Sequence, residues 1–170
     1  MAKNSFFIRA SVNAGKSGTY AESEIDLGAY TNLGSSKPEV LRILNVHPAI
    51  SDSDGEIPTS VTVSSTSLAW QLMTQSQTGL VLPTDDAFVC GGRSAYHNPA
   101  ASTQPVTQGI EEMILPQDWS NGYVIAVPTL FLGGFGGTNF AEDVYVSVIL
   151  ECVTEPMSKA NAVALAISQQ

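Results

Sequence analysis

The chain has 170 residues, of which 44% are hydrophobic and only 14% are charged, and its formal net charge is −9. This composition fits one folded domain with a real core and argues against disorder. The seven basic residues are scattered, with no two adjacent, so direct nucleic-acid binding is not expected. Most polar residues of the chain are uncharged, mainly Ser, Thr, Asn and Gln. Burying neutral groups costs less than burying charges, so such a surface suits large protein contacts.

The first residues, MAKNSFFIRASVN, lack the apolar stretch of a signal peptide. No run in the chain is as long as a transmembrane helix. We therefore expect the protein to stay in the cytosol after synthesis, or to assemble from there. Cys90 and Cys152 both fall in expected strands. A disulfide between them and two buried free thiols are both compatible with the sequence.

Apolar residues recur with a period of two along most of the chain, which is typical of half-buried β-strands. This alternation predicts about eight or nine strands. They are expected around residues 6–10, 25–27, 40–46, 61–63, 68–73, 87–90, 123–132 and 143–153. Trp70 falls in the middle of one of them and is a predicted core residue. No βαβ alternation is present, so a parallel α/β sheet is disfavoured.

Turn-forming residues separate the expected strands. These segments are 13–18, 34–38, 51–58, 98–99, 121–122 and 133–137. The polar, aperiodic stretch 91–109 is predicted to be a long crossing loop. Pro128 lies inside the long apolar run 123–132, where it indicates an edge position, a bulge or a bend.

The last residues differ in character from the rest. As a helix, they place Ala160, Val163, Ala164 and Ile167 on one face; as a strand, they alternate Val163, Leu165 and Ile167. Alanine favours the helix. We predict a sandwich domain at 1–155 and an arm at 156–170, which docks on its own sandwich or on a neighbouring chain.

Residues 10–17, ASVNAGKS, satisfy a relaxed form of the phosphate-binding P-loop motif. A P-loop needs a strand before it and a helix directly after it. The strand is expected, but 21–30 alternates as a strand and not as a helix. A hairpin-type loop is therefore favoured, and a P-loop nucleotide-binding enzyme is kept only as the second alternative function.

No catalytic constellation is found, so the protein is predicted not to be an enzyme and to use no cofactor or metal. Asp52, Asp54 and Glu56 resemble a fragment of a calcium loop, but Gly55 comes too early, and a turn capped by Asp is favoured. The adjacent carboxylates at 85–86 and 111–112 would point to opposite faces of a strand. Two His and two Cys at scattered spacing do not make a zinc site.

Five residues are candidates for contacts with other molecules. Trp119 lies beside a turn and is a candidate for an exposed contact; with Asp118 and Asn121 it forms a cluster that suits sugar binding. Phe135 is a large ring among four glycines and could anchor in a neighbour's pocket. The other three are Val163, Leu165 and Ile167 in the apolar arm.

The strand count, the neutral polar surface, the long crossing segment, the two long final runs YVIAVPTLFLGG and DVYVSVILECV and the apolar arm together predict an all-β jelly roll. In this architecture the chain resembles the single jelly-roll capsid proteins of tailless icosahedral viruses, over residues 5–155. The resemblance implies a shell subunit of the virion, assembled in the host cytoplasm. Its partners would be copies of itself and other capsid proteins, in homo- or hetero-oligomers.

The chain departs from many such proteins because it lacks a basic N-terminal arm. Contact with the genome would then pass through a membrane or another protein. A minor capsid, spike or cement role also fits the sequence. The principal alternative is a carbohydrate-binding, lectin-like sandwich that uses Trp119 and its polar neighbours.

Overall fold

A computed structural model describes residues 4–105 and 107–170. Eleven strands and two helices are assigned in this part of the chain. The strands are β1 (Phe6–Gly15), β2 (Tyr20–Asp26), β3 (Glu39–Ser51), β4 (Thr59–Ser60), β5 (Ser64–Met73), β6 (Phe88–Asn98), β7 (Gln104–Pro105), β8 (Thr107–Ile114), β9 (Tyr123–Ile125), β10 (Thr129–Gly136) and β11 (Val144–Pro156). The helices are the 3₁₀ turn η1 (Pro116–Asp118) and α1 (Lys159–Ser168).

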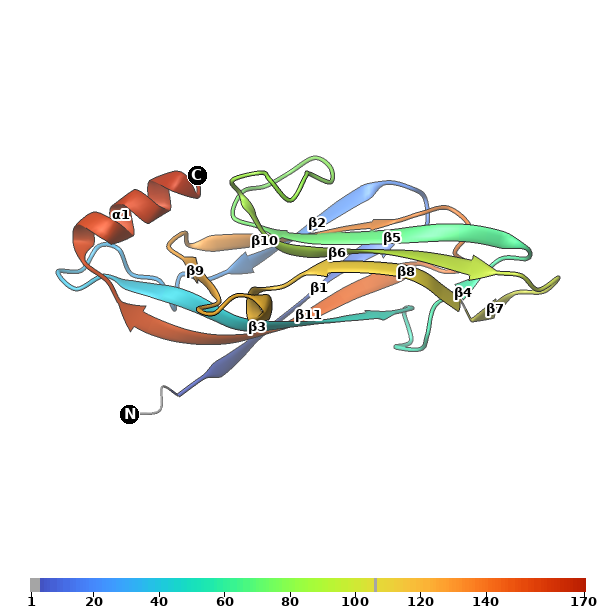
Figure 1. Ribbon diagram of the computed structural model, residues 1–170, viewed down its shortest axis with the longest axis horizontal. Helices are drawn as coiled ribbons and strands as arrows, with labels where there is room; N and C mark the ends of the chain where they lie inside the picture. Colours follow the sequence, from blue (N-terminus) through green and yellow to red (C-terminus); the bar gives the residue numbers. More distant parts are fainter. Residues whose placement is uncertain (1–3, 106) are drawn as a thin grey trace.

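The long strands form two antiparallel sheets that pack face to face (Figure 1). One has the order β1-β11-β3-β9 and the other β2-β10-β5-β6-β8, while β4 and β7 form a small separate pair. Eight strands remain when β4, β7 and the additional edge strand β8 are left out. If these eight are renumbered 1 to 8 in chain order, the two sheets have the strand orders 1-8-3-6 and 2-7-4-5. This order is that of a jelly roll. The predicted all-β antiparallel sandwich is confirmed.

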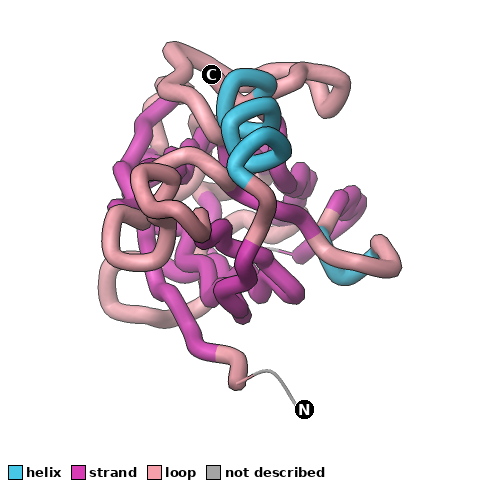
Figure 2. The backbone as a smooth tube through the Cα atoms, turned by 90° about the vertical axis from the view of Figure 1, so that its left-hand side faces the viewer, coloured by secondary structure: helices cyan, strands magenta, loops and turns pink. Residues whose placement is uncertain are grey.

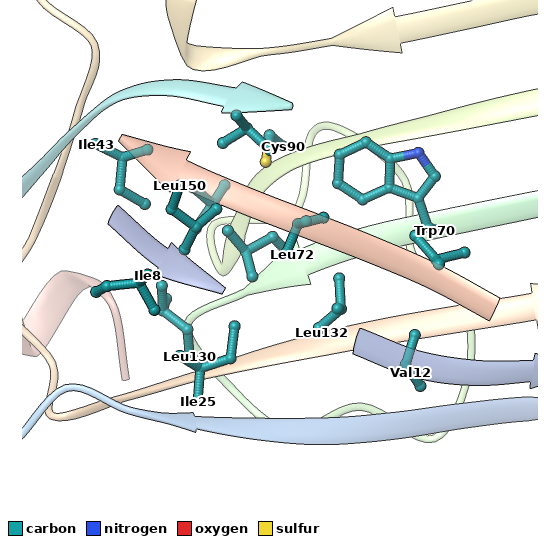
Figure 3. Packing of buried hydrophobic residues seen from close by; sticks show 14 of the residues in the cluster. Ile8, Val12, Ile25, Ile43, Trp70, Leu72, Cys90, Leu130, Leu132 and Leu150 are labelled. Carbon is teal, nitrogen blue, oxygen red and sulfur yellow. The ribbon is translucent and has the colours of Figure 1, made fainter. Parts of the chain in front are cut away.

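The core lies between the two sheets and follows from the alternation seen in the sequence. In β11, every second side chain faces inward and is buried: Val144, Val146, Val148, Leu150 and Cys152. They meet inward-facing residues of the opposite sheet, among them Leu72, Leu132 and the predicted core residue Trp70 (Figure 3). Cys90 and Cys152 are both buried free thiols, and burial raises the pKa of each.

Two glycine-rich segments predicted as loops are strands. Residues 91–109 contain most of β6, all of β7 and the start of β8. Gly92 faces Trp70, and a Cβ at Gly92 would lie 2.6 Å from the indole Nε1. Residues 133–136 belong to β10, where a Cβ at Gly136 would lie 2.0 Å from the carbonyl oxygen of Gly15. These glycines mark close packing and not turns.

The predicted strand at 123–132 is two strands in different sheets. β9 ends at Ile125 in the four-stranded sheet, and β10 begins at Thr129 in the five-stranded sheet. Pro128 lies at the crossing, where its carbonyl accepts a 2.7 Å hydrogen bond from the Leu27 amide. The predicted bend at Pro128 is therefore confirmed, because a residue without an N–H is tolerated at such a break.

The segment that matches the P-loop pattern joins the two sheets. β1 runs to Gly15, and β2 begins at Tyr20 in the opposite sheet. The connection is thus a crossover between sheets, which differs from the predicted hairpin. A strand follows it where a P-loop requires a helix, so the nucleotide-binding alternative loses its structural basis.

The arm contains α1, which lies at the end of the sandwich opposite β4 and β7 (Figure 1). Viewed from that end, α1 lies in front of the strands (Figure 2). Its Ser158 N-cap accepts a hydrogen bond from the Asn161 amide, which settles the choice between helix and strand. In the described part of the chain, no helix has the length and hydropathy to cross a bilayer.

Candidate interaction surfaces

Ten large apolar side chains are exposed in the described residues. They are Phe7, Ile57, Val61, Val63, Leu80, Leu82, Trp119, Ile149, Val163 and Ile167. Seven of them fall into three segments, which we name the tip loop (residues 52–63), the cover loop (residues 74–87) and the tail helix α1. Each segment is fixed to the sandwich by side-chain hydrogen bonds, so its apolar groups are held in place.

The tip loop is held by two buried polar residues. The Asn98 amide donates 3.0 Å hydrogen bonds to the carbonyls of Ser60, Val61 and Ser102, and the Ser60 hydroxyl donates to the Asn139 carbonyl at 2.9 Å. Beside this network Val63 has φ = 39°, in a left-handed region that β-branched residues rarely adopt. Its side chain is 67% exposed. The loop therefore presents a strained, rigid, apolar tip.

Asp52, at the start of the tip loop, caps a turn. Its Oδ1 accepts hydrogen bonds from the amides of Asp54 at 3.0 Å and Glu56 at 2.8 Å. This is the Asp-capped turn favoured by the sequence, with that oxygen directed at the loop's own backbone. In the described residues, no group of three or more His, Cys, Asp or Glu side chains is placed to hold a metal ion.

The cover loop is fixed to the outer face of the five-stranded sheet by Gln71. This buried side chain donates to the Gly79 carbonyl at 2.9 Å and to the Tyr20 hydroxyl at 3.1 Å, and accepts from the Val81 amide at 2.9 Å. Glu22 supplies a second anchor, because its carboxylate accepts from the Ser76 hydroxyl at 2.7 Å. Leu80 and Leu82 remain exposed on the loop.

Tyr20 makes this anchor sensitive to high pH. Burial raises its pKa to about 12, above the value of ~10 for an unfolded tyrosine. The unfolded chain therefore loses this proton first, so the free energy of unfolding should fall between pH 10 and 12, with the full contribution present below pH 10. We expect Tyr20→Phe to show a shallower fall than wild type in urea titrations across this range. Equal slopes would contradict the assignment.

The tail helix buries two of its alanines and leaves two of its large apolar residues exposed. Ala162 and Ala166 are buried against Val40 and Ala126. Val163 and Ile167, on the other side, are 40% and 66% exposed. A helix stabilised only by its own sandwich would bury the larger side chains, because burial of apolar area drives docking. The outward apolar groups are therefore available to another molecule.

Gln169 fixes the end of this helix to an edge strand. Its Oε1 accepts from the Ala126 amide at 2.9 Å, and its Nε2 donates to the Val124 carbonyl at 2.7 Å. The side chain thus takes the place of a neighbouring strand beside the short edge strand β9. An edge covered in this way is protected from pairing with other chains.

We expect Gln169→Ala to lower the free energy of unfolding by about 2 kcal/mol, because the buried Ala126 amide and the partly buried Val124 carbonyl lose their partner. Urea unfolding measures this effect. Gln170→Ala is the matched control, since the neighbouring Gln170 is exposed and its change should cost little. Equal stabilities of the two variants would show that the bonds made by Gln169 contribute nothing.

Trp119 is 42% exposed, and its ring lies 5.9 Å from that of Tyr123 with an interplanar angle of 39°. It follows η1, which Gln117 fixes to β3 by bonding both the amide and the carbonyl of Val46. One oxygen of Asp118 accepts from the Leu115 amide at 3.2 Å. The aromatic pair is therefore held on a rigid turn.

Phe135 lies in β10 and is half-buried, so the glycines around it are part of a strand and not of a flexible loop. Its pairing partners are Tyr20 on β2 and Ala69 on β5. It borders a shallow hollow that is also lined by Ala69, Leu80 and Ala95. The ring is thus one wall of an open apolar depression on the five-stranded sheet.

The five candidate residues occupy three separate places. Trp119 and Phe135 lie on a turn and on a strand, and the other three lie on α1. Within α1, Val163 and Ile167 face outward, whereas Leu165 packs partly against the buried cluster that holds the helix. Their roles as contacts remain predictions.

Sequence reasoning missed the three glutamines that fix these surfaces, which are Gln71, Gln117 and Gln169. Gln71 had a local signal, because it is the one polar residue in the apolar run LAWQLM. Gln117 and Gln169 had none, since each bonds backbone groups that are distant in the sequence.

No protein-family model matches the chain, and no curated protein matches its sequence. Solved structures do resemble it. VP1 of Trichodysplasia spinulosa-associated polyomavirus, in complex with GM1 oligosaccharide, has a TM-score of 0.49 at 11% identity and covers 90% of this chain and 96% of its own. The VP1 pentamer of human polyomavirus 6 has a TM-score of 0.45 at 7% identity, covering 91% and 96%. A structure of Desmodium yellow mottle tymovirus has a TM-score of 0.37 at 9% identity, covering 92% and 84%.

The chain is thus similar, over about 90% of its length, to polyomavirus VP1 and to a tymovirus structure, in line with the predicted resemblance. TM-scores below 0.5 carry no further argument, and the jelly-roll assignment rests on the strand order. Identities this low concern the fold alone. What the chain does has to be inferred from its own surfaces.

Proposed function

We propose that this protein is a structural subunit of a virion shell, which assembles through contacts with copies of itself and with other capsid proteins. The observation that carries the proposal is the set of large apolar side chains exposed on rigidly held segments of a jelly roll. Apolar groups on a fixed scaffold suit association, because little conformational freedom is lost when they are buried.

The strained tip loop supports this proposal most directly. A glycine would adopt the backbone of Val63 with less strain. An exposed valine there disfavours folding of the isolated chain, so its side chain is best explained by a contact outside the chain. Ile57 and Val61 extend the apolar surface of the same loop.

Charge adds a second support. Only 14% of residues are charged and basic residues are few. Contact surfaces can therefore lose water without burying many unpaired charges, which would be costly. The same scarcity of basic residues leaves no strong site for phosphates. We therefore propose that the subunit does not contact the genome directly, and that its place is the virion. The protein is proposed to have no enzymatic activity.

Val63→Gly separates assembly from folding. We expect this variant to unfold at an equal or higher urea concentration than wild type, because the strain is relieved, yet to assemble less. Light scattering behind a sizing column, over a range of protein concentrations, gives the mass distribution. A wild type that stays monomeric at every concentration would contradict the proposal, as would a variant with an unchanged mass distribution.

A second candidate is a glycan-binding module, which the exposed Trp119 and the half-buried Tyr123 beside it favour. Aromatic faces on a rigid turn can stack on a sugar ring. Trp70 is buried, so a change in tryptophan fluorescence on adding oligosaccharides would come from Trp119. Saturable quenching of a monomer that is lost in Tyr123→Ala, a variant that keeps the Trp119 reporter, would favour this function over assembly.

A further inference from the structure

The tail helix presents a self-complementary face. Lys159, Val163 and Ile167 follow one another at intervals of four residues, and all three are exposed. Residues four apart in a helix lie on the same side, so they form a short ridge. Val163 lies at the centre of this ridge, with the other two one turn away on either side.

The helix is also nearly neutral on a strongly acidic chain. Lys159 is the only charged residue of α1, whereas the whole chain carries a net charge of −9. Two copies approaching through this face therefore avoid the like-charge repulsion that acts elsewhere on the surface. One isolated lysine gives little attraction for an anionic membrane.

We propose that two copies of the chain pair their α1 helices antiparallel, about a two-fold axis that passes beside Val163. This inference rests on the proposed function and names one contact of the assembly. The partner that occupies the ridge is thus a second copy.

Antiparallel pairing gives each residue of the ridge a suitable neighbour. Val163 packs against Val163 of the partner subunit, and Ile167 faces the turn that contains the partner's Lys159 and the partner's Ala160. The small Ala160 side chain leaves room for Ile167, and the apolar stem of Lys159 can cover it. The lysine charge then lies near the C-terminal end of the opposite helix, which carries partial negative charge. A two-fold axis repeats each of these contacts.

Rigidity favours the pair. Gln169 and the buried face of Ala162 and Ala166 hold α1 in place, so the ridge has one orientation before contact. A pair of ten-residue helices still buries far less than the ~1,200 Å² of a stable interface. The pair should therefore be weak alone and become stable when other contacts hold the same copies together.

Site-directed crosslinking tests this arrangement. Cys90 and Cys152 are buried with raised pKa values, so wild type should be inert to a mild oxidant such as diamide. Val163→Cys places a thiol beside the two-fold axis, where it should link to its own copy and give a covalent dimer. Ser17→Cys is the matched control, since Ser17 is exposed in the connection between β1 and β2 and lies outside α1, the tip loop and the cover loop. It should give little dimer.

Adding Ile167→Lys to Val163→Cys should lower the dimer yield about tenfold, because the new ammonium group would face the partner's Lys159 and like charges across an interface repel. If the Val163→Cys protein forms oligomers of the same mass as wild type but gives no disulfide-linked dimer, the helix pair is wrong and the shell proposal still holds. A chain that is monomeric throughout would overturn both. Sedimentation of wild type with neutral phosphatidylcholine vesicles, if lost in Ile167→Lys and not accompanied by the crosslink, would instead identify a lipid surface as the partner.

Discussion

Gly136→Ala should destabilise the protein by about 3 kcal/mol or more, the upper range for overpacking a tightly packed site. A Cβ at this position would lie 2.0 Å from the carbonyl oxygen of Gly15 and 3.0 Å from that of Ala14. Both obstacles are backbone atoms, so no side-chain rotation relieves the clash. β10 and β1 would have to separate, and with them the two sheets at one side of the sandwich. Urea unfolding followed by Trp70 fluorescence measures the loss.

Gly79→Ala is the control for this variant. No atom lies within 4 Å of a Cβ built at Gly79, so alanine should be tolerated there. If Gly136→Ala unfolds at the same urea concentration as Gly79→Ala, the close approach of β1 to β10 is wrong.

Gln71→Leu should lower the free energy of unfolding by about 2 kcal/mol, because it leaves two partly buried backbone groups of the cover loop without partners. The Gly79 carbonyl, the Val81 amide and the Tyr20 hydroxyl all bond this one side chain. The loss of stability should affect the cover loop more than the rest of the domain. Hydrogen exchange in residues 74–87 should accelerate more than in the strands beneath.

Gln75→Leu provides the comparison in the same loop, because Gln75 is half-buried and the described residues offer its side chain no hydrogen bond. We expect this variant to behave like wild type. Equal stability of the two leucine variants would show that Gln71 does not anchor the loop.

The strands with one buried face could be predicted because local alternation reports burial directly. β11 is the best example: the apolar residues in DVYVSVILECV are the ones that reach the core. An irregularity at Pro128 could also be predicted, because proline lacks a backbone N–H in any fold.

The glycine-rich strands could not be predicted, because the reason for each glycine lies in a distant part of the chain. Gly92 accommodates the Trp70 ring, and Gly136 accommodates the backbone of β1. The intrinsic preference of glycine reflects only its conformational freedom, and it therefore indicates a turn. Contact across sheets overrides that preference, as it commonly does in β-structure.

The candidate surfaces were partly predictable. The exposure of Trp119 and the apolar character of the arm followed from the sequence. The choice between helix and strand did not, because Val163, Leu165 and Ile167 fit both patterns. It depended on the fit of Ala162 and Ala166 against Val40 and Ala126, which lie far away in the chain. The strain at Val63 had no sequence signal at all.

We propose that this jelly roll associates with copies of itself into a closed shell. Negative-stain electron microscopy of the concentrated, purified protein tests it most directly. We expect closed particles or rings of uniform size, because identical contacts repeated around symmetry axes close on themselves. Particles of single-subunit size at every concentration, or aggregates without any repeating geometry, would contradict it.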